Sequence, residues 1–355
     1  MLILVINPGS TSTKIAIYDD EKMVFKRNIS HSPEQLAPYN DVIEQFEFRK
    51  QLIMDVLKEE NYNINDFKAI IGRGGLTKPI PGGVYEVNDL MVNDARNAVQ
   101  KHASNLGCII AKAIADEVPG CRSFIADPVV VDELNDLARV CGSPLIKRHS
   151  IWHALNQKAI ARRYARENGK RYEDLNLIVC HLGGGISVAS HEKGMAVDVN
   201  NALDGEGPFS PERAGTIPAA DLVKLCFSGQ YTQQQVIKML NGKGGVTALM
   251  GINDMRELER LVAEEHDPKA TLVTDAMIYH VSKEIASQSA VLCGKVDAII
   301  LTGGIAYWKY VVEEITRRVG FIAPVVAYPG EDEMQALAFN ALSAIRGEVE
   351  AKQYK

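Results

Sequence analysis

Residues 2–14 read LILVINPGSTSTK, an apolar run that predicts a buried strand, followed by a turn with one glycine, four hydroxyl side chains and a lysine. A strand-like pattern resumes at once over residues 15–18. Glycine lets a backbone approach an anion closely, hydroxyl and N–H groups donate hydrogen bonds, and lysine supplies a positive charge. The turn therefore fits a phosphate tail, and it fits an ordinary β-hairpin with a polar turn equally well.

Residues 177–190, LIVCHLGGGISVAS, repeat this organisation. Each stretch has an apolar strand with a polar residue at its end (Asn7 and His181), and a glycine two residues later (Gly9 and Gly183). Both return immediately to a strand, and the two align with a one-residue gap. We predict an internal duplication, two halves that each begin with a phosphate-facing hairpin. Chance similarity between short hairpins is the alternative.

Composition limits the class of protein. A chain of 355 residues is long enough for about two domains, and its net charge of −6 argues against a nucleic-acid surface. The six cysteines are scattered without a CxxC pair, so we expect reduced core residues. No apolar run has the length of a signal peptide or a membrane span. We expect a soluble, cytoplasmic protein with neither nucleic acid nor membrane as a partner.

Strand-like and helix-like segments alternate along the chain, which favours an α/β fold. An amphipathic helix is expected from about residue 34 to residue 60, and another, carrying His153, after Ser150. A long helix is expected over about 269–293, and a terminal helix over about 334–346. No linker or low-complexity tract is visible, so the two halves are expected to pack against each other.

Three glycine turns follow predicted strands: Gly9, the run from Gly183 through Gly184 to Gly185, and the pair Gly303 and Gly304. Ligands of α/β sheets bind at the carboxyl ends of strands, where backbone N–H groups can face phosphates. A dinucleotide-binding crossover is disfavoured, because the second turn lacks the GxGxxG spacing and leads into a strand. A Walker P-loop is excluded, since Lys243 is followed by glycine in place of serine or threonine.

Several charged residues stand where strands or loops end. Arg73 lies between glycines, and Arg213 lies in an irregular loop. Each could be a cation that binds a ligand or an arginine of a solvated turn. Asp127 precedes a proline and could be a turn residue, a helix cap or a functional carboxylate.

His149 and His153 lie four apart and could share a helical face, either as a metal pair or as one functional and one packed histidine. The acids Glu331 to Glu333 are typical of a helix N-terminus, and a metal contact is the alternative.

Taken in order, these residues resemble the signatures of the acetate and butyrate kinase family. The resemblance begins at Asn7-x-Gly-Ser10-x-Ser12-x-Lys14 and runs to the terminal acidic cluster, so it spans nearly the whole chain. Acetate kinases usually carry asparagine at the position of Gly184, and an aromatic residue at the position of Arg148. These departures, with the shorter chain, move the resemblance towards the butyrate kinase branch and imply a larger carboxylate.

The resemblance implies an actin-like ATPase fold. Two duplicated α/β domains, each with a mixed five-stranded sheet, would enclose a nucleotide cleft. Domain one would cover 1–147 plus 331–355, with the terminal helix folding back onto it, and domain two would cover 148–330. Members of the family are commonly dimers or larger, so a homo-oligomer is expected.

The resemblance also implies the reaction, which converts ATP and a short-chain carboxylate reversibly into ADP and an acyl phosphate. The alternative is a non-metabolic ATPase of the same fold, although such relatives usually carry aspartate at the position of Asn7. The implied roles are substrate binding by Arg73; phosphoryl-charge stabilisation by Arg213 and His149; Mg²⁺ binding by Asp127 with Glu331 or Glu333; lining of the cleft floor by Asn7, Ser10, Ser12 and Lys14; phosphate binding by His181, Gly183, Gly184 and Gly185; and adenosine contact by Gly303 and Gly304.

Overall fold

The computed structural model describes residues 1–99 and 101–355, which form two compact units. The N-terminal unit comprises residues 1–131 and 332–355, and the C-terminal unit comprises residues 132–331. The predicted domain boundaries, after residue 147 and after residue 330, stay predictions. The interdomain cleft also stays a prediction.

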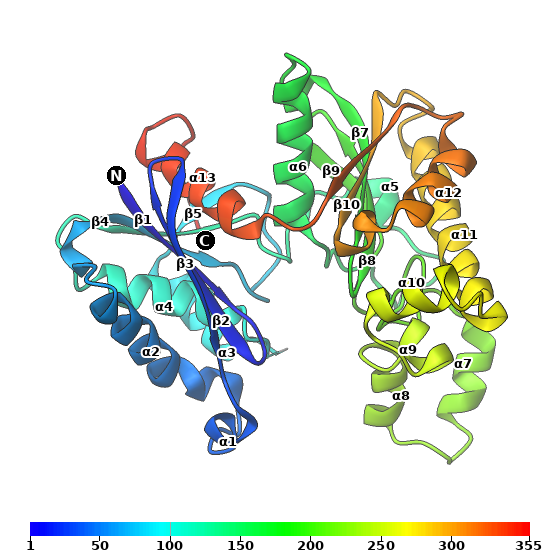
Figure 1. The fold of residues 1–355 in the computed structure, drawn as a ribbon, viewed down its shortest axis with the longest axis horizontal. Helices are drawn as coiled ribbons and strands as arrows, with labels where there is room; N and C mark the ends of the chain where they lie inside the picture. The colour runs from blue at the N-terminus through cyan, green and yellow to red at the C-terminus, as the bar shows by residue number, and fades with distance from the viewer. Residues whose placement is uncertain (100) are drawn as a thin grey trace. The chain divides into compact units, whose positions relative to one another are not determined.

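The N-terminal unit is built on a mixed sheet with strand order β12-β5-β6-β4-β1-β2-β3. Its core packs α2 and α4 against one face of the sheet, and α13 covers the other face (Figure 1). The strands are β1 (Leu2–Pro8), β2 (Ser12–Asp19), β3 (Lys22–Ser30), β4 (Phe67–Arg73), β5 (Val84–Glu86), β6 (Arg122–Ala126) and β12 (Lys352–Gln353). The helices are α1 (Pro33–Leu36), η1 (Val42–Gln45), α2 (Phe46–Glu59), η2 (Ile64–Asp66), α3 (Asp89–Asn97), α4 (Asn105–Ala115) and α13 (Glu333–Ile345).

The C-terminal unit is built on a five-stranded sheet with order β11-β10-β7-β8-β9. Alternate residues of β7 face opposite cores: Ile178 and Cys180 pack with α11 and α12, whereas Leu177 and Val179 pack with α6. The strands are β7 (Asn176–Leu182), β8 (Ile186–Glu192), β9 (Met195–Val199), β10 (Ala298–Gly303) and β11 (Val325–Pro329). The helices are α5 (Asp136–Arg139), α6 (Ala154–Glu167), η3 (Tyr172–Asp174), α7 (Ala219–Cys226), α8 (Gln233–Leu240), α9 (Gly245–Met250), α10 (Met255–Ala263), α11 (Pro268–Val291), η4 (Gly304–Tyr307) and α12 (Lys309–Val319).

The predicted duplication is visible in the strand pairing. In both units an antiparallel meander of three strands is followed by two strands that run parallel to the first. Asn7 pairs with Lys14 across the first hairpin, and His181 pairs with Ser187 across the second. The first pair therefore encloses one residue more than the second, which is the one-residue gap of the sequence alignment.

A shared irregularity supports the same conclusion. The register between the second and third strands shifts after Ile17 in the N-terminal unit and after Ser190 in the C-terminal unit, which are equivalent positions. The hairpin turns that follow also match, because Asp20 and Lys193 both have positive φ angles, of 51° and 46°. A bulge and a turn conserved between the halves are unlike a chance similarity of short hairpins.

Three details differ from the sequence-based expectations. The first sheet has seven strands in place of five, because the short strands β5 and β12 extend one edge. The single helix expected over 34–60 is divided into α1, η1 and α2. Of the cysteines, all free thiols, only Cys108 and Cys180 are buried, whereas Cys226 and Cys293 are exposed.

Within residues 1–99 and 101–355, no helix combines the length and the hydrophobicity that a bilayer span requires.

Candidate active site

Three polar side chains stand at one edge of the N-terminal sheet. Asn7 lies near the end of β1, Arg73 ends β4, and Asp127 directly follows β6. The three strands are adjacent and parallel, so their register places the three residues side by side. This is the edge at which α/β sheets bind ligands.

Glu333, the first residue of α13, joins two of these side chains. Its Oε2 atom accepts a hydrogen bond of 2.7 Å from Nδ2 of Asn7, and its Oε1 atom lies 3.2 Å from Nη2 of Arg73. The carboxylate is only 14% exposed, and it lies at a helix N-terminus, where negative charge is favoured. Glu333 therefore holds both Asn7 and the guanidinium group of Arg73 at this edge.

Asp127 is held in an unusual backbone conformation. Its φ angle is 38°, in the left-handed region that residues other than glycine rarely adopt. Its Oδ1 atom accepts a hydrogen bond of 2.7 Å from the N–H of Gly83, and its own N–H donates to the carbonyl of Gly83 at 3.0 Å. The side chain is thereby fixed at the sheet edge, as expected where backbone strain serves a site.

The first glycine turn rests on a buried arginine, Arg49 of α2, which is 0% exposed. Its Nη1 atom donates to the carbonyls of Gly9 at 2.8 Å and Ser12 at 3.1 Å. Its Nη2 atom donates to the carbonyl of Ser10 at 3.1 Å, and Oε1 of Gln45 accepts from Nε and Nη2. The carbonyl oxygens of the turn therefore point inward, towards the guanidinium group.

This arrangement determines where the N–H groups of the turn point. In a trans peptide the C=O and N–H bonds are opposed, so the N–H groups of Ser10 and Thr11 point away from Arg49. Burial lowers the pKa of Arg49 to about 10, so the group stays charged at neutral pH. Its hydrogen-bond acceptors are carbonyl, amide and hydroxyl oxygens, which are all uncharged. A buried positive charge beneath outward N–H groups favours an anion at this turn.

The second glycine turn, in the C-terminal unit, carries stacked histidines. The rings of His153 and His181 lie 3.8 Å apart between centroids and are inclined by 11°. Nε2 of His181 lies 3.0 Å from Oε1 of Glu331, and its Nδ1 lies 2.9 Å from Oδ1 of Asn156. Nδ1 of His153 lies 2.8 Å from Oγ of Ser187, the residue opposite His181 in the hairpin. Both histidines are thus fixed beside the turn.

Arg213 occupies the space beside Gly185. A Cβ atom on Gly185 would lie 1.5 Å from Nη1 of Arg213, so the guanidinium group fits only because this residue is glycine. Nη1 donates a 2.5 Å hydrogen bond to the carbonyl of Ala202. Burial lowers the pKa of Arg213, while Glu212 and Asp204 oppose this effect. The buried Nε has no hydrogen-bond acceptor within the described chain, which leaves a donor for a ligand.

The third glycine turn follows β10. Gly303 has a φ angle of 92°, and a Cβ atom there would lie 2.3 Å from the carbonyl oxygen of Leu182. Its N–H donates to the carbonyl of Gly330 at 3.1 Å. Gly304 begins η4, with open space where a Cβ atom would project. Only glycine is compatible with position 303, because both the positive φ angle and the close approach to Leu182 require it.

The chain resembles known proteins over its whole length. The Acetokinase family pattern matches residues 141–323. A protein of Bacteroides thetaiotaomicron named "Probable butyrate kinase" is 57% identical over 355 residues, which is 100% of both chains. Butyrate kinase 2 of Clostridium acetobutylicum is 54% identical over 354 residues, 99% of each chain. The chain belongs to the acetokinase family.

Solved structures share the fold of this chain. Acetate kinase of Porphyromonas gingivalis superposes with a TM-score of 0.80 at 18% identity, over 97% of this chain and 99% of that chain. A propionate kinase of Francisella tularensis gives a TM-score of 0.75 at 19% identity, over 96% and 98% of the two chains. At such identities the likeness concerns the fold alone, and it confirms the expected duplicated α/β architecture.

The predicted site residues of this acetokinase form two groups, one in each unit. The acidic pair is divided between these groups, because Glu333 contacts Arg73 and Glu331 contacts His181. His149 is exposed and lies in the irregular segment before α6. The group of the N-terminal unit contains Asn7, Ser10, Ser12, Lys14, Arg73, Asp127 and Glu333; that of the C-terminal unit contains His181, Gly183, Gly184, Gly185, Arg213, Gly303, Gly304 and Glu331.

His149 and His153 do not share a helical face. Helix α6 begins at Ala154, with His153 as its N-cap and His149 outside it. Stacking on His181 accounts for the position of His153.

Arg49 was not predicted as a site residue from the sequence. Its signal was present, because Arg49, Ile53, Val56 and Leu57 occupy one helical face of α2 and all are buried. An arginine within such a stripe indicates a buried cation that needs acceptors.

Proposed function

We propose that this acetokinase transfers the γ-phosphoryl group of ATP to butyrate, or to a close relative of it, and forms an acyl phosphate and ADP. The observation that carries the proposal is the identity above 50% over the full length with relatives named butyrate kinase. A carboxylate oxygen attacks the γ-phosphorus, and the bond from this phosphorus to the β,γ-bridging oxygen breaks with its electron pair going to ADP. The reverse reaction makes ATP.

The chemistry requires cations and positioning more than proton transfer. A carboxylic acid is already ionised at neutral pH, since carboxyl pKa values lie at about 4. The barrier comes from bringing an anion to a polyanion, which fixed positive charges and hydrogen-bond donors reduce. Arg73 and Arg213 have the required character: the first contacts a carboxylate in Glu333, and the second has a buried donor.

The roles proposed for individual residues follow from these positions. Arg73 binds the substrate carboxylate, and Arg213 stabilises negative charge on the transferring phosphoryl group, with His149 as a second donor. The remaining assignments are the first turn (Asn7, Ser10, Ser12 and Lys14) and the second turn (His181, Gly183, Gly184 and Gly185) for phosphates, and Gly303 with Gly304 for the adenosine.

Mg²⁺ is the expected companion of ATP. In the described part of the chain, no three His, Cys, Asp or Glu side chains gather to form a metal centre by themselves. This fits Mg²⁺, which is usually held by one or two carboxylates, water and substrate phosphates. Asp127 directly follows β6, and Glu333 contacts residues at the ends of the adjacent strands β1 and β4, so we propose that these two acids hold the ion. When bound, Mg²⁺ would neutralise charge on the phosphate oxygens.

The proposed activity can be tested directly. Purified protein incubated with ATP, Mg²⁺, butyrate and hydroxylamine should form butyryl hydroxamate, because hydroxylamine traps acyl phosphates. A series of acids from acetate to hexanoate, including branched acids, should give the highest kcat/KM near four carbons. One methylene changes pocket affinity by only about 1–3 kcal/mol, so neighbouring acids should differ by about 10–200-fold at most. Absence of hydroxamate with every acid would contradict the proposal.

Removal of either arginine should abolish most activity. Arg73→Ala and Arg213→Ala are each expected to reduce kcat/KM by about 10²–10³-fold, as when a preorganised donor to a transition-state charge is deleted. The control is Arg317→Ala, which removes an arginine from an exposed pair with Glu314 and should leave the kinetics unchanged. Near-complete activity in either variant would show that its assigned role is wrong.

A further inference from the structure

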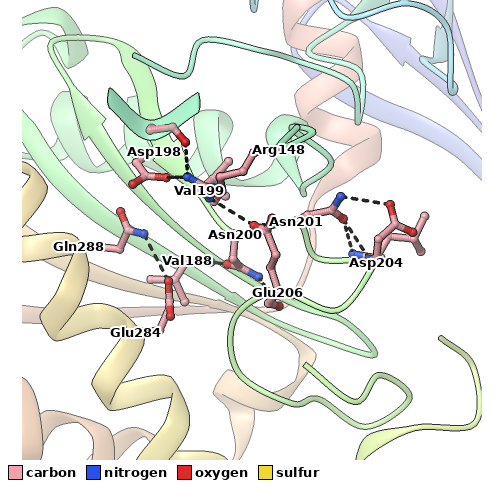
Figure 2. Close-up of polar contacts among 12 residues, drawn as sticks. Arg148, Val188, Asp198, Val199, Asn200, Asn201, Asp204, Glu206, Glu284 and Gln288 are labelled. Carbon is pink, nitrogen blue, oxygen red and sulfur yellow. Dashed lines mark hydrogen bonds and ion pairs between the residues drawn. The ribbon is translucent and has the colours of Figure 1, made fainter. Parts of the chain in front are cut away.

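Arg148, the residue before His149, clamps both ends of the loop formed by residues 199–206. Its Nη2 atom donates to the carbonyl of Val199 at 2.9 Å and lies 3.2 Å from Oε2 of Glu206. Its Nη1 atom lies 3.0 Å from Oδ1 of Asp198, at the end of β9 (Figure 2). It also donates to the carbonyl of Ala138 at 2.6 Å. One guanidinium group thus closes the loop, and its planar fork suits several acceptors at once.

The loop is also fixed internally. Oε2 of Glu206 accepts a hydrogen bond of 3.0 Å from the N–H of Asn201, so this carboxylate connects Arg148 to the loop tip. Oδ1 of Asn201 accepts from the N–H groups of Leu203 and Asp204, both at 3.0 Å, and builds the turn (Figure 2). The conformation of the loop therefore depends on the side chain of Asn201 and on that of Glu206, which Arg148 holds.

The loop presents Ala202 between two other segments. The N–H of Ala202 donates to the carbonyl of Ile151 at 2.9 Å, and its carbonyl accepts the 2.5 Å hydrogen bond from Nη1 of Arg213. Ala202 thereby sets the position of the guanidinium group beside Gly185. A displacement of the loop would move the acceptor of Arg213, and a shift of about 1 Å in a catalytic group can lower the rate about 100-fold.

The surroundings explain why an arginine is needed here. Asp198 and Glu206 face Arg148. Burial is the largest cause of the raised pKa of Glu284 on α11. The hydrogen bond from Gln288 and the positive charge of Arg148 oppose this increase, whereas the negative charges of Asp198 and Glu206 add to it (Figure 2). Without Arg148, the carboxylates would repel one another and open the loop.

We infer that Arg148 is a positioning residue for catalysis, acting through Glu206 and the 199–206 loop to place Arg213 for phosphoryl transfer. The inference rests on the proposed function, specifically on the role of Arg213.

The test is a double-mutant cycle with Arg148→Met and Arg213→Ala, measured from acyl phosphate and ADP with sensitive detection of ATP. Arg148→Met should lower kcat about 100-fold with little change in KM. If Arg148 acts through Arg213, adding Arg148→Met to Arg213→Ala should cause no further loss, whereas independent effects multiply. The matched control is Arg122→Met, which breaks a two-hydrogen-bond pair with Glu86 in the other unit and should leave kcat unchanged.

Each outcome decides the inference. A kcat within twofold of wild type for Arg148→Met, or multiplied losses in the double variant, would overturn it. If Arg148→Met does not fold, Glu206→Gln replaces it in the same cycle under the same criteria, because it keeps the shape of the side chain and loses the charge that faces Arg148. Full activity of Arg213→Ala alone would overturn the proposed role of Arg213 instead, so the two failures are distinguishable.

Discussion

Gly185→Ala should lower kcat about 10²–10³-fold, as severe a loss as expected for deletion of one donor to a transition-state charge. The added methyl group would lie 1.5 Å from Nη1 of Arg213, so the guanidinium group would have to leave its position. Backbone strain does not contribute, because the φ angle of Gly185 lies outside the left-handed region. Steady-state kinetics with butyrate and ATP would measure the loss.

The neighbouring glycine provides the matched control. A Cβ atom on Gly184 would lie 3.6 Å from Oε2 of Glu212, an ordinary contact, and its φ angle is also outside the left-handed region. Gly184→Ala and Gly184→Asn should therefore leave Arg213 in place and lower kcat far less than Gly185→Ala does. Equal losses in the Gly184 and Gly185 variants would mean that the turn tolerates no side chain, and that displacement of Arg213 is not the cause.

Arg49→Met should destabilise the N-terminal unit and weaken nucleotide binding together. Hydrogen bonds to a charged group contribute about 1.5–3 kcal/mol each, so loss of the contacts to the turn should reduce the free energy of unfolding by at least about 3 kcal/mol. The turn would also lose the group that orients its N–H donors and supplies positive charge, so the KM for ATP should rise. Denaturant unfolding and a KM measurement below the melting temperature would check both effects.

Lys50→Met is the control on the same helix. Lys50 adjoins Arg49 in the sequence and is paired with Glu117, which is 48% exposed. Loss of such a surface pair costs about 1 kcal/mol or less, and it should leave the KM for ATP unchanged. An Arg49→Met protein with wild-type stability and wild-type KM would show that the buried cation has neither role.

Local signals in the sequence were sufficient for much of the fold. The long helix expected over 269–293 and the terminal helix expected over 334–346 correspond to α11 and α13 within two residues at each end. The helix expected over 34–60 is interrupted because its polar and proline-containing first third forms separate short turns, whereas the apolar stripe of α2 packs into the core of the unit. Periodicity locates a buried face, and it does not tell where packing ends.

The class of fold, the duplication and the positions of the glycine turns can be predicted from the residues alone, because strand periodicity and turn chemistry are local properties. Which side chains meet depends on how distant parts of the chain pack. Arg49 reaches the first turn from a helix, Glu333 reaches Arg73 from the other end of the chain, and Arg213 fills the space left by Gly185. Such contacts join residues far apart in sequence, and they depend on the register of the sheet and the placement of helices on it.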